Sequence, residues 1–460
     1  MDHPCVGLSY GPNDKTVLHA GYGIYYAQLF YNDFGEHTKQ GFDASPNFTS
    51  PDGHSPAFYW QDGVPQNFAR PPFTDPAGVN LQNIDFIAPE DRVPYIQSWN
   101  LGIERELPLQ IRLSASYAGN KGTRLYRGFD IEQLDPRYLA LGPLLSDNIN
   151  DPAVVAAGFT APYATFFSDW GSGATLARAL RLFPQYSGVT YYNNTDGYST
   201  YNSFQLKVEK RFSEGLQFLV SYTNSKTLTD ADSLFPFTAF AFTQNDHNSK
   251  LEKSVSTDDQ PQVLAASYLY ELPVGRGKHF LNRGGIVNKV LGGWQLNGIV
   301  QYSSGTPLQL GAGCPSIGDN FGGGCRPNVV PGQPLLGPGA SGKPDPNNGK
   351  PYLNAAAFSV PAPFTYGNAA RLLSGARSFG FKNENIGLLK NTRVTESVGL
   401  QFRVEAFNIF NRILFSGPDT FIGSYDPLQP ENLNRNPNFG VFSGQSNIPR
   451  VVQFGLKVLF

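Results

Sequence analysis

The end of the chain alternates between apolar and polar residues, and the same alternation recurs along most of the sequence. Between positions 450 and 460 the apolar face would consist of Val452, Phe454, Leu456, Val458 and Phe460. Successive side chains of a strand point to opposite faces of a sheet, so this stretch has one apolar face and one mostly polar face. We therefore predict a β-strand that reaches the last residue, Phe460.

The strongest alternation predicts a β-hairpin with limbs over 203–212 and 216–223 and a turn over 213–215. Each limb has about the 9–11 residues that a tilted membrane strand needs. Leu219 is the one apolar residue on the polar side, and Lys210 interrupts the apolar side next to the turn. A lysine at such a place can extend its ammonium group to a membrane interface.

Eight further stretches alternate in the same way, which brings the expected number of strands to eleven. They lie at 6–10, 18–26, 95–105, 109–117, 264–272, 294–302, 386–388 and 400–406. We therefore expect a sheet in which each strand is joined to the next along the chain.

The connections between these strands alternate in length. Those at 11–15, 107–108, 213–215, 273–291 and 392–397 are short or moderate. Those at 27–94, 129–198, 229–258, 305–380 and 413–446 are long and rich in Pro, Gly, Asn and Asp. Loops beyond ~15 residues are uncommon in compact domains. Since every second connection is long, all long loops would emerge on one side, which indicates an all-β, antiparallel transmembrane β-barrel with long extracellular loops.

The composition favours a β-rich chain over a helical membrane protein. Charged residues make up 16% of the 460 residues, against about 25% in ordinary soluble domains, and aromatic residues make up 13%. The mean hydropathy is −0.29 and no apolar run approaches the ~18 residues of a membrane helix, which excludes helical membrane proteins only. The net charge of −2 gives no reason to expect a nucleic-acid partner.

No constellation of residues points to catalysis, and we expect no enzyme, no bound metal and no cofactor. The histidines are scattered without ligand spacing, at His3, His19, His37, His54, His247 and His279. The sequence contains no HExxH, no GxSxG and no pair of CxxC motifs. Residues 337–343 resemble a phosphate-binding loop, but Pro344 stands where Ser or Thr is required, so we interpret the match as chance.

Two groups of loop residues leave alternatives open. Cys314 and Cys325 bracket a Gly-rich loop and either form a disulfide in an oxidising compartment or remain two free thiols. The acidic pairs at 230/232 and 258/259 offer oxygen ligands for calcium, and solvated loop carboxylates are the plainer account.

The polar sides of two predicted hairpins supply candidates for residues that face a barrel lumen. They are Lys207, Glu209, Arg211, Arg403 and Glu405. We expect Arg403 and Glu405 to form an ion pair, with contact to a substrate as the alternative.

Aromatic residues on the apolar sides are candidates for a belt at the membrane interface, with ordinary β packing as the alternative. They are Tyr95, Trp99, Tyr222, Tyr270, Trp294 and Tyr302.

Seven short stretches, spread over nearly the whole chain, carry a resemblance to a known family. They are 15–26 (KTVLHAGYGIYY), 94–101 (PYIQSWNL), 206–212 (LKVEKRF), 272–277 (LPVGRG), 292–298 (GGWQLNG), 304–307 (SGTP) and 402–411 (FRVEAFNIFN). In this order they resemble the barrel of Oar-like TonB-dependent outer-membrane transporters. The resemblance implies a 22-stranded barrel that is gated by an N-terminal plug and powered through a TonB-box contact. It also implies that Phe460 is part of the signal read by the barrel-assembly machinery.

The chain departs from that family pattern in what it contains. We find no signal peptide, plug, TonB box or N-terminal carboxypeptidase-regulatory-like domain, and only about half the strands. We therefore expect residues 1–460 to form a single partial barrel, roughly the second half, in the outer membrane of a Gram-negative-type bacterium. Its expected partners are outer-membrane lipid, the barrel-assembly machinery, an unidentified substrate, and TonB only through the missing N-terminal part. A structural or adhesive β protein is the alternative, and a soluble hydrolase is the least supported.

Overall fold

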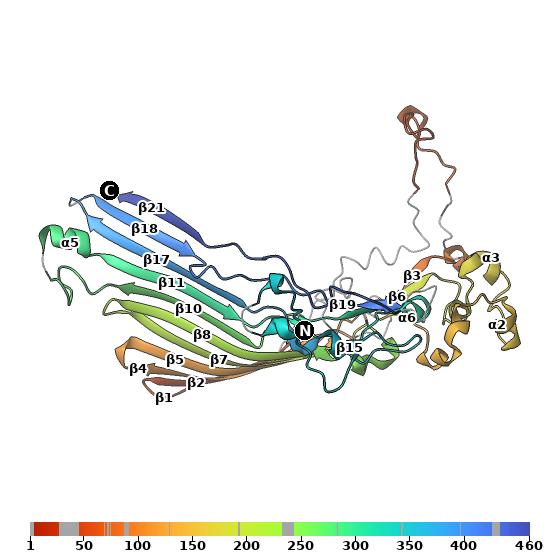
Figure 1. Ribbon diagram of the computed structural model, residues 1–460, viewed down its shortest axis with the longest axis horizontal. Coiled ribbons are helices and arrows are strands. Elements are labelled where there is room, and N and C mark those ends of the chain that lie inside the picture. The colour runs from red at the N-terminus through yellow and green to blue at the C-terminus, as the bar shows by residue number, and fades with distance from the viewer. Residues whose placement is uncertain are drawn as a thin grey trace.

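The computed structural model describes residues 4–26, 46–68, 70, 73, 75–86, 92–127, 129–191, 194–231, 243–282, 284–341, 344–395, 397–425 and 433–460 (Figure 1). Its main sheet has 12 strands, and all of them except β9 follow one another in chain order. These are β1 (Cys5–Asn13), β2 (Thr16–Tyr26), β4 (Tyr95–Leu107), β5 (Ile111–Leu125), β7 (Gly197–Ser213), β8 (Leu216–Thr229), β10 (Gln262–Glu271), β11 (Trp294–Ser303), β17 (Phe381–Arg393), β18 (Gly399–Phe407) and β21 (Val451–Leu459). Each pair of neighbours is antiparallel, and the eleven predicted strands are confirmed. The short β9 (Ser254–Val255) adds to the end of β8.

The sheet has one apolar and one polar face, and the cross-strand register keeps each face continuous. Residues directly opposite each other on paired strands share a face. Leu206 lies opposite Tyr222, which in turn lies opposite Leu264. One position along, Lys207 lies opposite Ser221 on the other side of the sheet. We call these two surfaces the apolar face and the polar face.

The two ends of the sheet differ because the connections alternate in length as predicted. At the turn end, β7 and β8 are joined by Glu214 and Gly215, whose φ angles of 54° and 82° suit a tight two-residue hairpin. The longest connection at this end, 272–293, contains α5 (Gly285–Leu291). The opposite end, which we call the loop end, carries all the long connections (Figure 1).

The long connections fold into a layer of their own, which we call the loop layer. Its helices are α2 (Pro152–Ala156), α3 (Phe166–Trp170), α4 (Leu176–Ala179) and α6 (Pro315–Phe321). Its strands are β3 (Asn83–Phe86), β6 (Gly188–Tyr191), β12 (Pro307–Leu308), β13 (Gly311–Gly313), β14 (Asn328–Val329), β15 (Phe358–Ser359), β16 (Leu373–Arg377), β19 (Phe421–Tyr425) and β20 (Leu433–Arg435).

Short 3₁₀ turns complete the layer, and one more lies at the turn end. In the loop layer these are η1 (Trp60–Asp62), η2 (Pro76–Val79), η4 (Pro136–Ser146), η5 (Gly171–Gly173), η7 (Asp246–Glu252), η8 (Pro338–Ala340), η9 (Pro346–Asn348) and η10 (Ala355–Ala357). The turn between β4 and β5 is η3 (Pro108–Gln110). Within the described ranges, no helix is long and apolar enough to cross a membrane.

The hydrophobic core lies in the loop layer rather than against the sheet. Its buried apolar residues all fall outside the eleven long strands and include Phe166, Leu176 and Phe358. On the apolar face of the sheet, by contrast, Leu101 is 61% exposed. The sequence pattern did not predict this core, because the helices that build it have only 4 to 7 residues and show no clear period.

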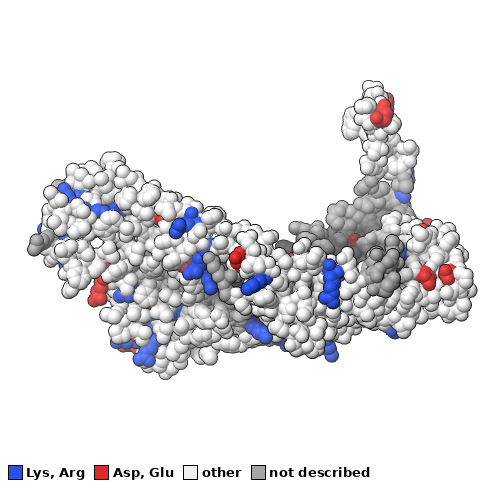
Figure 2. Space-filling view, viewed as in Figure 1, with Lys and Arg blue, Asp and Glu red and all other residues white. Residues whose placement is uncertain are grey.

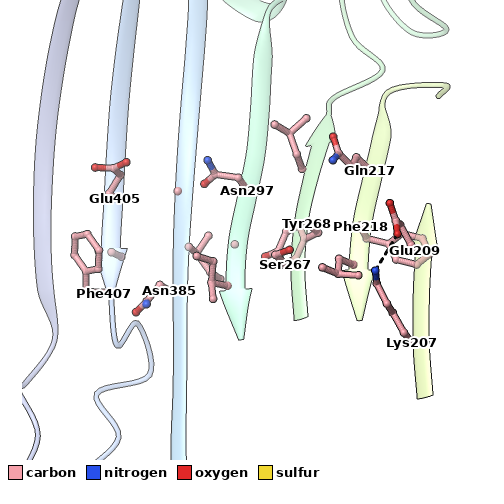
Figure 3. Close-up of a pocket in the computed structure, with 17 residues that line it drawn as sticks. Lys207, Glu209, Gln217, Phe218, Ser267, Tyr268, Asn297, Asn385, Glu405 and Phe407 are labelled. Carbon is pink, nitrogen blue, oxygen red and sulfur yellow. Dashed lines mark ion pairs between the residues drawn. The ribbon is translucent and has the colours of Figure 1, made fainter. Parts of the chain in front are cut away.

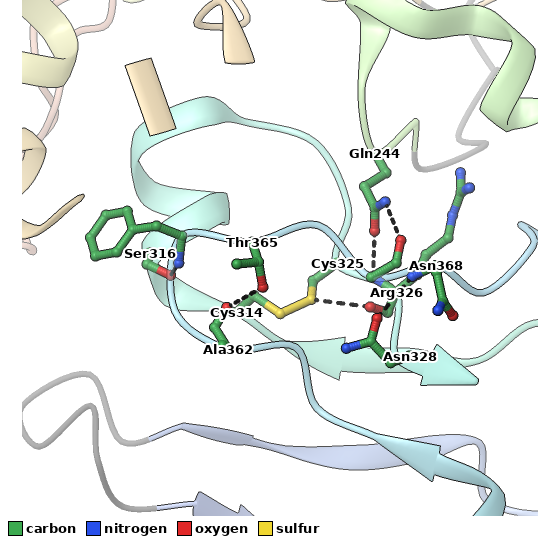
Figure 4. Close-up of a disulfide and its surroundings, with 11 residues drawn as sticks. Gln244, Cys314, Ser316, Cys325, Arg326, Asn328, Ala362, Thr365 and Asn368 are labelled. Atoms are coloured by element: carbon green, nitrogen blue, oxygen red, sulfur yellow. Dashed lines mark hydrogen bonds between the residues drawn. A yellow bond between two sulfur atoms is a disulfide. The ribbon is translucent and has the colours of Figure 1, made fainter. Parts of the chain in front are cut away.

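A disulfide between Cys314 and Cys325 closes one segment of the loop layer (Figure 4). Cys314 directly precedes α6, and the backbone N–H of Arg326 next to the second cysteine donates to Oε1 of Gln244 at 3.1 Å. Of the two alternatives left open by the sequence, the structure shows the bonded pair. Disulfides persist in oxidising compartments, so the pair fits a protein outside the reducing cytoplasm.

The first and last strands form the edges of the sheet within the described residues. There, β1 pairs with β2 alone, and β21 pairs with β18 alone. All residues of both strands are exposed, with Val6 at 73% and Phe454 at 72%. An unpaired edge presents a row of N–H and C=O groups without partners, which the interior of a bilayer does not tolerate.

Leu176→Ala should destabilise the loop layer by about 2–5 kcal/mol, because it removes a buried side chain and leaves a cavity. Leu176 is 0% exposed whereas Leu182 is 65% exposed, so Leu182→Ala is a matched control that should be nearly neutral. Hydrogen exchange of the loop-layer amides would compare the two variants. Equal loss of protection in both would contradict the assignment of the core.

Candidate functional site

The polar face holds a cavity of about 570 Å³ that extends across strands β7 to β18 (Figure 3). The cross-strand register brings its lining together, because Glu209 lies opposite Leu219, Leu219 opposite Ser267, and Ser267 opposite Ile299. These four side chains form one continuous row across neighbouring strands on the polar face.

The lining combines uncharged polar groups, a few charges and an apolar strip. Its polar members from this face are Lys207, Glu209, Gln217, Ser267, Asn297, Asn385 and Glu405. The apolar strip consists of Leu219, Leu269, Ile299 and Phe407. Amide and hydroxyl groups can hydrogen-bond a neutral polar molecule, and the strip can pack against an apolar one. The cavity is therefore suited to binding a ligand or another protein segment. Within the described ranges, no three His, Cys, Asp or Glu side chains are grouped to hold a metal ion.

Four of the five residues predicted to face a lumen line cavities on the polar face. Lys207, Glu209 and Glu405 line the large cavity, and Lys207 forms an ion pair with Glu209 at 3.3 Å. Arg211 lines a second cavity of about 210 Å³ near the turn end, together with Glu209 and Arg112. Whether these residues face a lumen stays a prediction.

The predicted ion pair between Arg403 and Glu405 is wrong. Nε of Arg403 donates to Oε1 of Gln401 at 2.6 Å. Oε2 of Glu405 accepts from Nε2 of Gln453 at 2.5 Å. Gln453 lies directly opposite Glu405 in the register, and Gln401 lies two positions before Arg403 on the same strand, so each member of the expected pair has a glutamine partner instead.

The position of Lys210 also differs from the expectation. Its side chain is buried and does not extend to an interface; Nζ donates to the carbonyl of Leu109 at 2.7 Å and to Oγ of Ser213 at 2.5 Å. The lysine therefore satisfies polar groups at two adjacent turns, which is why a cation is accommodated on the apolar face.

The six candidate belt aromatics lie on the apolar face at several heights. Tyr95 and Tyr302 lie at the loop end of their strands, and Tyr270 and Trp294 lie at the turn end. Trp99 and Tyr222 lie further along their strands. The belt at a membrane interface stays a prediction for all six.

Trp99 shows that local packing also shapes this face. A Cβ atom at Gly119, directly opposite Trp99, would lie 2.7 Å from the indole ring. The indole therefore covers the backbone of a glycine on the neighbouring strand, and only glycine admits this approach.

Tyr302 belongs to a polar group that sequence reasoning missed. Its hydroxyl donates to Oε1 of Glu384 at 2.6 Å, and Nε of Arg412 donates to both oxygens of Glu384 at 2.8 and 2.9 Å. Glu384 is 3% exposed. It stands at an apolar-face position of β17 close to the loop end, and that break in the alternation is the signal that could have revealed it.

Phe460, the candidate assembly signal, directly follows β21 and is 99% exposed. Its recognition by the barrel-assembly machinery stays a prediction.

The loop layer contains a second polar centre, in which charged groups are buried together. The side chain of Arg127 is 1% exposed and forms ion pairs with Asp196 at 2.8 Å and Asp246 at 3.6 Å. Burial raises the pKa of Asp246 to about 6 and the pKa of Glu132 to about 7. Oε1 of Glu132 accepts from the N–H of Phe183 at 3.0 Å, whereas Oε2 has no partner within the described residues.

Other carboxylates in the loops are also paired rather than solvated. Asp259 is 1% exposed and forms an ion pair with Arg377 at 2.6 Å, so the prediction of a solvated carboxylate is wrong there. Asp230 accepts from the N–H of Tyr198 at 2.5 Å, and burial raises its pKa. Asp232 lies outside the described residues.

Residues 3–453, nearly the whole chain, match the family of the outer membrane beta barrel domain. The chain therefore belongs to this family, and it is a β-barrel protein of the cell outer membrane. No curated protein matches its sequence.

Three solved structures to which the chain is similar, each with a TM-score below 0.5, are the following. The pyoverdine receptor FpvA from Pseudomonas aeruginosa PAO1 has 11% identity and a TM-score of 0.38, over 100% of this chain and 36% of the receptor. The transporter YddB from Escherichia coli has 7% identity and a TM-score of 0.43, over 97% and 39%. The siderophore receptor PiuA from Acinetobacter baumannii has 8% identity and a TM-score of 0.39, over 99% and 35%. The chain thus spans between about a third and two fifths of the length of these proteins.

Cysteine labelling should separate the two faces of β18. Glu405 lies in the cavity on the polar face, and its neighbour Val404 lies on the apolar face. In a Cys5→Ser background, the thiol in Glu405→Cys should react with a charged, membrane-impermeant maleimide, because it faces water. The thiol in Val404→Cys should react much more slowly in detergent micelles, whose apolar phase covers the apolar face. Equal rates at the two positions would contradict this orientation of the sheet.

The stability of the loop layer should fall as the pH rises from about 4.5 to 7. The pKa values of Glu132 and Asp246 in the folded protein, about 7 and about 6, exceed their ordinary values of 4.5 and 3.8. Between these limits the folded loop layer keeps protons that the unfolded chain releases, so each rise in pH favours unfolding.

Hydrogen exchange at pH 5 and pH 7.5, corrected for intrinsic rates, would measure this dependence. Glu132→Gln should flatten it, and Glu214→Gln at the exposed hairpin turn should leave it unchanged. Protection that rises with pH in the unmodified chain would refute the burial of these carboxyl groups.

Proposed function

We propose that the chain forms part of the barrel of an Oar-like TonB-dependent transporter. In this proposal the long loops capture a substrate, and the lumen admits it once a plug moves. The motifs between residues 15 and 411 support the Oar-like subtype. The membership of the outer membrane beta barrel family supports a membrane-spanning sheet.

The observation that carries the proposal is the pair of edges at β1 and β21. Both strands are exposed along their full length and have one partner each within the described residues. A bilayer requires each edge to be paired. Residues 1–460 would therefore be a single partial barrel domain whose closure needs strands from outside this chain.

The polar face would line the lumen of the closed barrel. The apolar strip of the cavity supports a further contact there, because Ile299 is 51% and Phe407 is 42% exposed although both lie on the polar face. Exposed apolar patches commonly mark contact surfaces. In the proposal, this strip packs against the plug, which another part of the protein supplies.

The proposed partners follow from the same arrangement. Lipid would cover the apolar face, with the aromatic belt at its borders. The barrel-assembly machinery would bind the last strand and Phe460. TonB would act only through the N-terminal part, and the substrate is of an unidentified class.

Adhesion through the loops is the second candidate function, and one feature of the loop layer favours it. An arm formed by residues 46–68 projects from the layer (Figure 1). Within this arm, Trp60 is 83% and Tyr59 is 60% exposed, and the rings of Phe58 and Trp60 stack at 6.4 Å. Such a surface could bind a glycan or a partner protein. A signal peptide and a plug encoded in frame upstream of Met1 would decide for transport.

The purified chain alone should not form a working gated pore, because both edges of its sheet lack a partner. Heat-modifiable migration on gels would report a closed barrel, and single-channel conductance in planar bilayers would report a pore. We expect neither, whereas a porin in the same bilayers provides the positive control. A stable, gated conductance from the chain alone would overturn the proposal of a partial barrel.

A further inference from the structure

The connection 272–293 at the turn end exposes an unusual number of large apolar side chains. Ile286 is 80%, Val290 is 55% and Phe280 is 55% exposed. Leu281, Val287 and Leu291 are exposed by 41–51% as well. Six such residues lie within 12 positions, and such a concentration of exposed apolar side chains is a mark of a contact surface. We call these six residues the apolar patch.

The patch is amphipathic in its arrangement. At 100° per residue, Ile286, Val287, Val290 and Leu291 fall on one side of α5, and Asn288 and Lys289 fall on the other. Asn288 points into the connection, where its Oδ1 accepts from the N–H of Arg276 at 2.7 Å. The polar side of α5 is therefore anchored within the protein through Asn288, and the four apolar side chains remain 41–80% exposed among the described residues.

Internal hydrogen bonds hold the rest of the connection in the same way. The N–H of Phe280 donates to the carbonyl of Pro273 at 2.8 Å, and the N–H of Gly275 donates to the carbonyl of Phe280 at 3.0 Å. The N–H of Gly277 donates to Oδ1 of Asn282 at 2.7 Å. The exposed apolar side chains thus belong to an ordered segment.

Two contacts join α5 to the apolar face of the sheet. Nε1 of Trp294, an apolar-face residue, donates to the carbonyl of Val290 at 3.1 Å. Nζ of Lys390 lies 5.1 Å from the centre of the Trp294 ring and donates to the carbonyl of Gly292 at 2.6 Å. The end of α5 is therefore attached to residues of the apolar face, the face that meets lipid in an outer-membrane barrel.

The charge of the connection selects the kind of lipid. Residues 272–293 contain four basic residues, Arg276, Lys278, Arg283 and Lys289, and no acidic residue. Arg276 and Lys289 are exposed, while Lys278 pairs with Glu271 at 2.8 Å. Basic side chains beside an apolar helix face are typical of segments that lie in the interface of anionic membranes.

We propose that the connection 272–293 is an interfacial anchor, which inserts the apolar side of α5 into the phospholipid leaflet at the turn end and binds anionic headgroups through Arg276 and Lys289. The anchor would fix the depth and tilt of the sheet at that end. It depends on the outer-membrane location of the chain and not on transport.

Spin labels at three positions would test the depth of α5 in vesicles of phosphatidylethanolamine and phosphatidylglycerol. In the Cys5→Ser background, the label replaces Ile286 through Ile286→Cys. Leu101→Cys on the apolar face is the lipid reference, and Ile448→Cys at the loop end, 75% exposed in the native chain, is the water reference. The label at 286 should be accessible to oxygen and at least fivefold less accessible to a water-soluble nickel chelate than the label at 448.

The same accessibility measurements can be made in mixed micelles of detergent and phosphatidylglycerol. They then do not require the chain to insert into vesicles, because the labels report contact with the apolar phase of the micelle. Equal nickel accessibility at 286 and 448 would overturn the anchor. Protection of position 286 from both oxygen and nickel would also overturn it, since the helix would then be covered by protein, such as a second copy.

The contribution of the basic residues needs its own variant. Arg276→Gln combined with Lys289→Gln should move the label at 286 toward water in phosphatidylglycerol vesicles and leave it unchanged in neutral phosphatidylcholine vesicles. An equal shift in both lipids would show that the charges do not bind headgroups and would overturn that part of the proposal.

Discussion

Backbone hydrogen bonding is the constraint on which the rest of this structure depends. The interior of a bilayer offers no water to N–H and C=O groups, so a strand that crosses it needs a partner on each side. Apart from the short β9, the strands from β2 to β18 in the main sheet each have a neighbour on both sides. Within the described residues β1 and β21 have one neighbour each. The requirement for a partner on each side of a strand therefore identifies β1 and β21 as the strands that need a further neighbour in a bilayer.

Once the backbone is paired, the polarity of the side chains determines which face of the sheet can meet lipid. Three charged residues are exceptions on the apolar face. Lys210, Glu384 and Lys390 stand at apolar-face positions near the ends of their strands. Each has a defined polar partner: turn groups for Lys210, Arg412 for Glu384, and the carbonyl of Gly292 for Lys390. At these three positions a partner within the protein replaces water around the charge. Figure 2 shows charged side chains scattered over the surface in view, most of which consists of other residues.

The sheet could be predicted from the sequence because one physical period describes it. Alternation at residues such as Phe204 and Leu206 identifies a strand without knowledge of its neighbours, and the loop lengths then order the strands. The lining of the cavity could be predicted only in part. The alternation identified Lys207 and Glu209, but the apolar strip around Ile299 depends on the register of three or more strands. The expected ion pair between Arg403 and Glu405 was wrong because both side chains bond glutamines, Gln453 on the neighbouring strand for Glu405 and Gln401 on the same strand for Arg403.

The loop layer escaped prediction because long-range contacts, rather than periodicity, hold it together. Arg127 forms an ion pair with Asp246, more than a hundred residues further along the chain, and no local sequence pattern predicts such a pair. The layer is nonetheless attached to the sheet by specific contacts at the loop end. Nη2 of Arg371 donates to the carbonyl of Thr229, the last residue of β8, at 2.9 Å. Nη1 of Arg377 donates to the carbonyl of Gly305, just beyond β11, at 3.3 Å.

These arginines bind carbonyl groups at or just beyond the places where strands leave the sheet, so they extend the backbone pairing from the sheet into the loop layer. A rearrangement of the loops at the mouth of the sheet has to break charge-assisted hydrogen bonds that are largely removed from water, since Arg371 is 3% exposed and Asp259 beside Arg377 is 1% exposed. Such contacts are costly to leave without a partner. The loop layer is therefore expected to move together with the strand ends to which these arginines bind it.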